Sequence, residues 1–373
     1  MSCSVAMAAS SPAAFSPSRM THSSSSSSSS SSFKTSPETL TLTHLHHHPS
    51  SDGSPSSTSP FKSRFGRGSS SSCSSSSSLK RKRPARIDIP MIDAALSLVP
   101  AMMMGEAEVE MDGPRCSVYC KRGRKRLAME DRYKADLDLD GDSQFAFFGI
   151  FDGHGGSKAA DFAAENIGKH IVDELRKGSD GESNVEGAVR NGYLKTDSEF
   201  LKEEIGSGTC CVTALVSKGD LVVSNAGDCR AVLSASGTAE ALTSDHKPSR
   251  EDERERIESL GGFVDNCRGV WRLQGSLAVS RGIGDSLHKQ WVIPDPETRV
   301  LKIEPGFEFL VLASDGLWDK VSNQEAVDVA RPFCVDMHNP SPLHACRKLA
   351  ELSASRGSVD DISVMIVQLK HFT

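Results

Sequence analysis

Several acidic side chains of this sequence stand next to short apolar runs, often beside a glycine. Asp152 follows FFGIF, Asp228 follows SNAG and Asp315 follows LVLAS, while Asp360 and Asp361 precede ISVMIV. Hard divalent cations such as Mg²⁺ and Mn²⁺ prefer oxygen ligands and use a few carboxylates. Carboxylates at the ends of adjacent strands can converge on such ions, although Asp-Gly pairs also mark ordinary turns. The spacing alone leaves both interpretations open.

The segments around these acids predict the elements that would position them. Residues 144–151 form an apolar run between turn residues, which is typical of a buried strand, and 155–178 carry apolar residues at helical spacing. We expect a second helix over 184–204 and a meander of consecutive antiparallel strands over 209–237. Helices before and after such strands indicate an α+β fold in which two sheets are covered by helices.

Eight segments resemble, in order, the signature series of the metal-dependent type 2C Ser/Thr protein phosphatases, the PPM family. They are RLAMEDR, FFGIFDGHGG, GTCCVTALV, SNAGDCRAVL, SDHKP, GSLAVSRGIGD, LASDGLWD and DDISVMIV, and they extend from about Val118 to Leu369. The resemblance implies two packed antiparallel β-sheets flanked by helices, a four-layer α-β-β-α sandwich. It also implies two Mn²⁺ or Mg²⁺ ions in the cleft between the sheets.

The resemblance also assigns ligands to the two ions. Asp152 matches the acid that bridges both ions, and the carbonyl group of Gly153 matches a ligand of one of them. Asp315 and Asp360 match the carboxylates on the other ion. Glu130 matches an acid that holds metal-bound water.

A third, looser metal site in the family uses positions that match Asp228, Asp315 and Asp319. The family commonly has Asp-Asn before its last strand, whereas this chain has Asp360-Asp361. Asp360 is assigned as the ligand, and Asp361 remains a competitor for that role.

In the family, a hydroxide formed between the two ions attacks the phosphorus in line. Arg126 matches the phosphate-binding arginine, whose planar guanidinium group holds two phosphate oxygens. His154 matches the residue proposed as the general acid for the departing Ser or Thr alkoxide. The alternative for His154 is an imidazole that only orients water.

Two alternatives to a metal-dependent phosphatase stay open. The segment CKRGRKR, from Cys120 to Arg126, has the C-x-x-G-x-x-R spacing of cysteine-dependent phosphatases, in which Cys120 would be a thiolate nucleophile. Tyr119 and Leu127 replace the usual flanking residues of that motif. The second alternative is a degenerate phosphatase domain that serves as a kinase-binding scaffold, against which the intact set of acids argues.

Composition divides the chain into three parts. Residues 1–78 are dominated by serine and are expected to be disordered, because they cannot bury enough apolar surface to offset the entropy of ordering. Residues 79–115 hold a basic and apolar segment and a linker, and 116–373 form the expected catalytic domain. The acidic balance of this domain argues against nucleic-acid binding, and no apolar run approaches a membrane span. We expect a monomer.

The basic segment LKRKRPARIDIP resembles the docking motif by which phosphatases bind mitogen-activated protein kinases. Its cations would meet an acidic patch of the kinase, while alternate isoleucines fill apolar pockets. The residues concerned are Lys80, Arg81, Lys82, Arg83, Ile87 and Ile89. A nuclear-localisation signal is the rival interpretation and does not exclude docking. We therefore expect a plant phosphatase that dephosphorylates and inactivates such kinases in stress or defence signalling.

Two further expectations concern location and regulation. We expect the protein in the nucleus and cytoplasm, with the chloroplast as the alternative, because an acid-poor, Ser-rich leader also fits a transit peptide. Family members that abscisic acid receptors inhibit carry a tryptophan in the loop that corresponds to GGFVDNCRGVWRL, and Cys267 occupies that position here. A thiol cannot supply the buried area and N–H donor of an indole, so we expect no inhibition by these receptors.

Overall fold

The computed structural model describes residues 107–177, 184–335 and 340–372. The chain divides into the units Met1–Ile87 and Asp88–Thr373, and all described residues belong to the second. The Ser-rich leader and the predicted docking segment therefore lie outside the described residues. No helix of the described part is long and apolar enough to cross a membrane.

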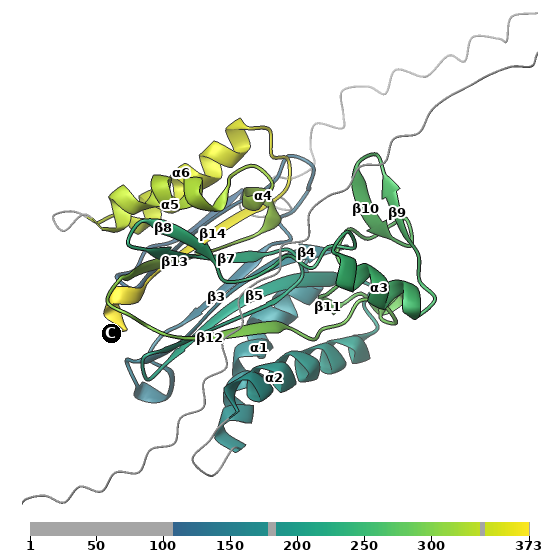
Figure 1. Ribbon diagram of the computed structural model, residues 1–373, viewed down its shortest axis with the longest axis horizontal. Helices are drawn as coiled ribbons and strands as arrows, with labels where there is room; N and C mark the ends of the chain where they lie inside the picture. Colours follow the sequence, from purple (N-terminus) through teal and green to yellow (C-terminus); the bar gives the residue numbers. More distant parts are fainter. Residues whose placement is uncertain (1–106, 178–183, 336–339, 373) are drawn as a thin grey trace, which may run out of the picture. The chain divides into compact units, whose positions relative to one another are not determined.

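The first sheet contains both the earliest and the latest strands of the described chain (Figure 1). Its order is β1 (Glu108–Met111), β2 (Cys116–Lys121), β14 (Ile362–Gln368), β13 (Phe307–Ala313), β7 (Arg230–Ala235) and β8 (Thr238–Ala241). All its ladders are antiparallel. The strand β1 lies in the range expected to be linker, so the folded part begins upstream of residue 116.

The second sheet is also antiparallel and comes from the middle of the chain. Its order is β12 (Glu297–Lys302), β6 (Asp220–Ala226), β5 (Gly208–Ser217), β4 (Phe145–His154) and β3 (Arg132–Asp136), and β11 (Ile283–Gly284) pairs with β5. A separate hairpin consists of β9 (Val264–Cys267) and β10 (Val270–Leu273).

Helices cover the outer faces of both sheets (Figure 1). The second sheet packs against α1 (Lys158–Lys177), which in turn packs on α2 (Val185–Phe200). The first sheet packs against α5 (Asn323–Cys334) and α6 (Pro342–Ser355). Two shorter helices are α3 (Glu251–Ser259) and α4 (Asp315–Trp318). The predicted α+β sandwich of two antiparallel sheets flanked by helices is confirmed.

The apolar run of β4 is continuous because both faces of this strand are buried. Side chains alternate between the two faces of a strand. Phe148 and Ile150 enter the core between the two sheets, whereas Phe147 and Phe151 enter the core under α1. The strand is therefore anchored on both sides, and its last residues, Asp152 to His154, occupy a fixed position at the end of the sandwich.

The meander predicted over 209–237 is only partly present. Strands β5 and β6 pair as predicted, but β7 pairs with β13 and β8 in the other sheet. The chain changes sheets at Gly227, whose φ of +118° favours glycine and where a Cβ atom would collide with the side chain of Cys210. The prediction is wrong for β7 because β12 takes the place beside β6. The crossing places Asp228 between the two sheets.

Candidate active site at the end of the two sheets

Acids from both sheets lie at this end of the sandwich. Asp152 is on β4, and Asp228 lies in the crossing from β6 to β7. Asp315 begins α4 shortly after β13, and Asp360 shortly precedes β14. A cavity of about 280 Å³ has Asp228 and Asp315 in its wall, together with Trp271 of the hairpin strand β10. The structure thus brings Asp228 and Asp315, from segments far apart in the sequence, into one cavity wall.

The buried carboxyl groups repel one another when they are charged. Burial is the main cause that raises the pKa of Asp315 to about 8, and the charges of Asp228, Asp319 and Asp360 add to it. The pKa of Asp152 is raised well above its usual value by burial and then by the surrounding carboxylates. Nearby like charges and desolvation both disfavour the ionised form. A bound cation would relieve both effects.

Asp131, in the motif RLAMEDR, is a further acid that was not a predicted site residue. Its side chain is buried, and its Oδ2 accepts a hydrogen bond of 2.7 Å from Ser363 Oγ. Its Oδ1 has no hydrogen-bond partner among the described residues. Burial first, and then the charge of Asp361, raise the pKa of Asp131 to about 7. This unpaired oxygen lies near Asp152, Asp228, Asp315 and Asp360, here called the acid cluster. It could bind a cation directly or accept a hydrogen bond from water on the cation.

Gly153 lies directly against the loop that carries Glu130. A Cβ atom at Gly153 would collide with the backbone carbonyl oxygen of Glu130. Only glycine allows β4 to pass this close to the loop, so Gly153 brings the backbone of Glu130 next to the end of β4. The side chain of Glu130 forms an ion pair with Arg126.

The two acids before β14 have different surroundings. Asp361 is buried, and its Oδ1 and Oδ2 accept hydrogen bonds from the backbone N–H groups of Gly123 (2.6 Å) and Glu130 (2.7 Å). Both carboxylate oxygens of Asp361 are therefore engaged. Asp360 is more exposed, and its Oδ1 lies 3.3 Å from Nη2 of Arg126. Of the two acids, Asp360 therefore has the carboxylate that is more accessible to an ion.

Arg126 lies among these acids and not beside Cys120. The guanidinium group contacts the carboxylates of Glu130 and Asp360 and remains partly exposed. An arginine held by two carboxylates at the edge of the cluster is already oriented, and its planar group can exchange these contacts for phosphate oxygens.

His154 contacts Asp285, the last residue of the motif GSLAVSRGIGD. Its Nε2 lies 2.8 Å from Oδ1 of Asp285, which is buried. Burial of the imidazole lowers its pKa, but the hydrogen bond to Asp285 and the charges of Asp285 and Asp228 outweigh burial, so that the pKa of His154 is raised. The structure thus favours a protonated imidazole at this position.

Lys247, in the motif SDHKP, lies within the set of acids predicted for the third metal site. Its Nζ is 3.6 Å from Oδ2 of Asp228, 3.5 Å from Oδ1 of Asp319 and 3.8 Å from Oδ2 of Asp245. The charges of these acids outweigh burial and raise the pKa of Lys247. This part of the cluster therefore already contains one positive charge.

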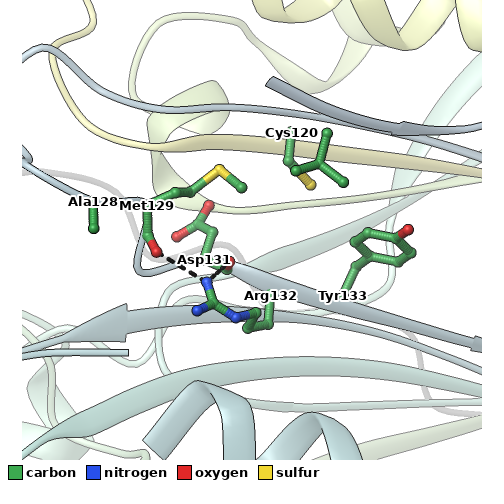
Figure 2. Close-up of a pocket in the computed structure, with 7 residues that line it drawn as sticks. Cys120, Ala128, Met129, Asp131, Arg132 and Tyr133 are labelled. Atoms are coloured by element: carbon green, nitrogen blue, oxygen red, sulfur yellow. Dashed lines mark hydrogen bonds between the residues drawn. The ribbon is translucent and has the colours of Figure 1, made fainter. Parts of the chain in front are cut away.

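The Cys120 motif is not assembled into a thiolate site. Figure 2 shows Cys120 in the wall of a cavity of about 330 Å³, opposite Met129, Asp131 and Tyr133. Cys120 is fully buried on β2, and burial raises the pKa of its thiol to about 12. A thiol with this pKa is protonated at neutral pH and is a poor nucleophile. The arginine of the motif points to the acid cluster instead.

The donor set fits hard divalent cations, although the side chains do not form a ready-made cage. The residues available are carboxylates, one backbone carbonyl and the unpaired Oδ1 of Asp131, all of them oxygen donors. Within the described residues, no three His, Cys, Asp or Glu side chains are close enough together to be recognised as a metal site.

Three side chains at this site were not among the predicted site residues: Asp131, Lys247 and Asp285. All three were within the quoted motifs RLAMEDR, SDHKP and GSLAVSRGIGD. Their presence in these motifs was the available signal. Their roles depend on contacts with residues far away in the sequence, which spacing does not show.

Comparisons with known proteins point to one family. The family model described as "Protein phosphatase 2C" matches residues 117–362. "Probable protein phosphatase 2C 30" of Arabidopsis thaliana is 61% identical over 303 residues, which cover 78% of this chain and 77% of the relative. "Probable protein phosphatase 2C 32" of Oryza sativa subsp. japonica is 61% identical over 269 residues, 71% of this chain and 69% of the relative.

Solved structures agree with the fold. A structure of "serine-threonine phosphatase 2C from Toxoplasma gondii" matches with a TM-score of 0.59 and 26% identity, covering 70% of this chain and 98% of the other. A C. elegans sex determining protein matches with a TM-score of 0.63 and 24% identity, covering 70% of this chain and 68% of the other. At that identity the second match supports the fold alone.

Proposed function

The chain belongs to the protein phosphatase 2C family and is a protein Ser/Thr phosphatase, and on this basis we propose that its acid cluster is a metal-dependent active site. The observation that carries the proposal is the group of carboxyl groups from both sheets, whose pKa values are raised first by burial and then by one another's charges. Such a group is costly unless cations compensate it. When bound, Mn²⁺ or Mg²⁺ would supply an activated water nucleophile and neutralise charge on the phosphate.

The proposed ligands divide between the two sheets. Asp152 and the carbonyl group of Gly153 come from β4, while Asp315 and Asp360 come from the ends of β13 and β14. We assign to Glu130, whose backbone lies against Gly153, the role of holding metal-bound water. We assign a third, weaker site to Asp228, Asp315 and Asp319, which contribute to a single cavity wall.

Two cationic side chains complete the proposed site. Arg126 exchanges its carboxylate contacts for two oxygens of the substrate phosphate and so orients the phosphorus atom. His154 donates a proton to the Ser or Thr oxygen as the P–O bond breaks. Burial lowers the pKa of His154, but the hydrogen bond to Asp285 and the nearby charges outweigh burial and raise it, which favours the protonated imidazole that this transfer requires.

The test is a hydrolysis assay on a phosphothreonine peptide with added Mn²⁺, with Mg²⁺ and with chelator. We expect activity only with a divalent ion, and Asp152→Ala to lower kcat by at least about 10³-fold, because metal-ion activation supplies several kcal/mol. Cys120→Ser is the matched control and should retain most of the activity. Chelator-resistant activity that iodoacetamide abolishes would instead support the thiol mechanism.

We also propose that mitogen-activated protein kinases are substrates and that the segment around Lys80 to Ile89 docks on them. This proposal is supported by the sequence of the segment, in which a run of basic residues precedes two isoleucines that are separated by one residue. An extended segment of this kind adds cation contacts and apolar anchors outside the active site. The same cations support a proposed location in the nucleus and cytoplasm. These residues lie outside the described part of the structure.

A further inference from the structure

His154 and Asp285 meet across a glycine of the strand between them. His154 ends β4 and pairs with Gly208 of β5, while Gly284 of β11 pairs with the same Gly208 from the other side. Asp285 follows Gly284 directly. A Cβ atom at Gly208 would collide with both Nε2 of His154 and Oδ2 of Asp285. The absence of a side chain on the middle strand is therefore what lets the two residues form their 2.8 Å contact.

Asp285 is held firmly by its backbone. Its N–H group donates a hydrogen bond of 3.1 Å to the carbonyl oxygen of Ser207. The preceding N–H of Gly284 donates to Oδ1 of Asp197 at 2.8 Å, and Lys289 Nζ donates to the same oxygen at 2.6 Å. Asp285 itself has a φ of 55°, in the left-handed region that is costly for an aspartate. The surrounding contacts thus maintain a strained conformation that points its carboxylate at His154.

Among the described side chains, the carboxylate of Asp285 forms a hydrogen bond with His154 alone. It is buried, Oδ1 contacts Nε2 of His154, and Oδ2 has no hydrogen-bond partner among the described residues. A buried carboxylate with an unpaired oxygen is destabilising, and a stability role would favour a fuller set of partners. The imidazole is partly exposed, and its Nδ1 has no partner among the described residues.

We infer that Asp285 is a positioning residue that holds Nε2 of His154 and thereby directs Nδ1 to the leaving oxygen of the substrate, an inference that rests on the proposed phosphatase function. Because the carboxylate accepts a hydrogen bond from Nε2–H, the proton to be transferred is the one on Nδ1. As the P–O bond to Ser or Thr breaks, this proton passes to the departing oxygen. The imidazole is left neutral with its proton on Nε2.

The first experiment compares leaving groups in the variant Asp285→Asn. A Ser or Thr alkoxide needs a proton to depart, whereas p-nitrophenolate is a stable anion that does not. We expect kcat on a phosphothreonine peptide to fall by about 10–100-fold, the usual effect of losing a carboxylate that orients a functional histidine. Hydrolysis of p-nitrophenyl phosphate and the affinity for Mn²⁺ should change little.

The matched control is Asp295→Asn. Asp295 is also an aspartate near the end of the same loop region, but it forms a surface ion pair with Arg190. Both substrates should be hydrolysed as by the wild type. Equal losses on both substrates in Asp285→Asn, accompanied by loss of Mn²⁺ affinity, would overturn the inference, as would an unchanged kcat on the peptide.

A double-mutant cycle tests whether Asp285 acts through His154. In a His154→Ala background, Asp285→Asn should cause almost no further loss on the phosphopeptide, because its effect requires the imidazole. Losses that multiply would show that Asp285 acts independently of His154.

Nitrogen-15 NMR of the wild-type imidazole tests the geometry without any activity measurement. At alkaline pH, where His154 is neutral, we expect its proton on Nε2 and a bare Nδ1. A proton on Nδ1 would contradict the inference even if every variant failed to fold. If the wild type lacked metal-dependent activity but showed the Nε2–H form, the proposed function would fail while the positioning contact stood.

Discussion

Asp361 accepts a hydrogen bond of 2.7 Å from the backbone N–H of Glu130, a residue 231 positions earlier in the chain. Its other carboxylate oxygen accepts the N–H of Gly123 at 2.6 Å. These two bonds attach the loop of Arg126 and Glu130 to the beginning of β14, next to Asp360. The acid that the sequence offered as a competing ligand is thus the one that fixes the loop.

Asp361→Asn should therefore destabilise the protein, although the family commonly has asparagine at this position. An amide group has one accepting oxygen, so its nitrogen would face a backbone N–H donor and leave that group unpaired. We expect a loss of about 1–3 kcal/mol in the free energy of unfolding. Denaturant unfolding of the metal-free protein measures this. Asp360→Asn is the control and should have little effect, because Asp360 is more exposed; equal stability of the two variants would contradict the argument.

The metal-free protein should lose stability as the pH rises from about 4 to about 8. The pKa of Asp315 is raised to about 8 and that of Asp131 to about 7, while unfolded carboxyl groups titrate near 4. Below pH 4 both states are protonated, but above it the unfolded chain ionises and the folded acids still hold their protons, which favours unfolding.

Mn²⁺ should reverse this trend, because its carboxylate ligands must be deprotonated. The increase in Tm on adding Mn²⁺ should be greater at pH 8 than at pH 6, as measured by scanning calorimetry. In Asp315→Asn the pH dependence without metal should be weaker. The change in Tm from pH 5 to pH 8 is compared between the metal-free wild type and metal-free Asp315→Asn. If the Tm of the wild type rises more than that of the variant, the buried acids do not destabilise the folded state as proposed.

Lys247→Met should tighten binding at the weak third metal site. The ammonium group lies within 4.0 Å of Asp228 and Asp319, so it competes with a divalent ion for the same carboxylates. We expect the Kd of the weakest Mn²⁺ site to fall by about tenfold, which corresponds to about 1.4 kcal/mol for removal of one nearby charge. Titration calorimetry or Mn²⁺ electron paramagnetic resonance measures it. Lys320→Met is the control, because it removes an exposed lysine that directly follows Asp319 in the sequence. Unchanged or weaker binding in Lys247→Met would contradict the competition.

The hairpin of β9 and β10 carries the prediction about hormone receptors. Cys267 ends β9 and pairs with Val270 across the turn. We expect no inhibition by abscisic acid receptors with hormone at equimolar concentrations, because a thiol cannot replace an indole in the receptor. Cys267→Trp should introduce inhibition, and Cys267→Ser should not. Potent inhibition of the wild type would show that the tryptophan position was assigned incorrectly.

The docking segment should affect only intact kinase substrates. Replacing residues 80–83 by alanines, or both Ile87 and Ile89 by alanines, should weaken kinase binding and slow dephosphorylation of the intact kinase. Hydrolysis of p-nitrophenyl phosphate, which needs only the active site, should be unchanged. The cation variant alone should lose the salt dependence of binding. If both variants bind the kinase like the wild type and differ only in nuclear accumulation, the segment is an import signal.

Local patterns in the sequence were enough to predict the features of this protein that depend on neighbouring residues. The apolar run before Asp152 predicted β4, and helical spacing predicted α1, because periodicity reports how a segment is buried. The ordered motifs identified the family and with it the α+β sandwich, and the comparisons confirmed both. The thiol alternative at Cys120 could not be rejected from spacing, since burial of the thiol depends on the rest of the fold.

Which residues contact one another depends on how the sheets and helices pack in three dimensions. The tertiary structure placed β7 in the sheet opposite β6, engaged Asp361 with backbone donors, set Lys247 among the acids and paired Asp285 with His154. Each of these contacts joins segments that are distant in sequence, and the free energy that selects them comes from packing two sheets together. A local pattern records that a residue is buried or turns the chain, but it carries no information on the partner that it will contact.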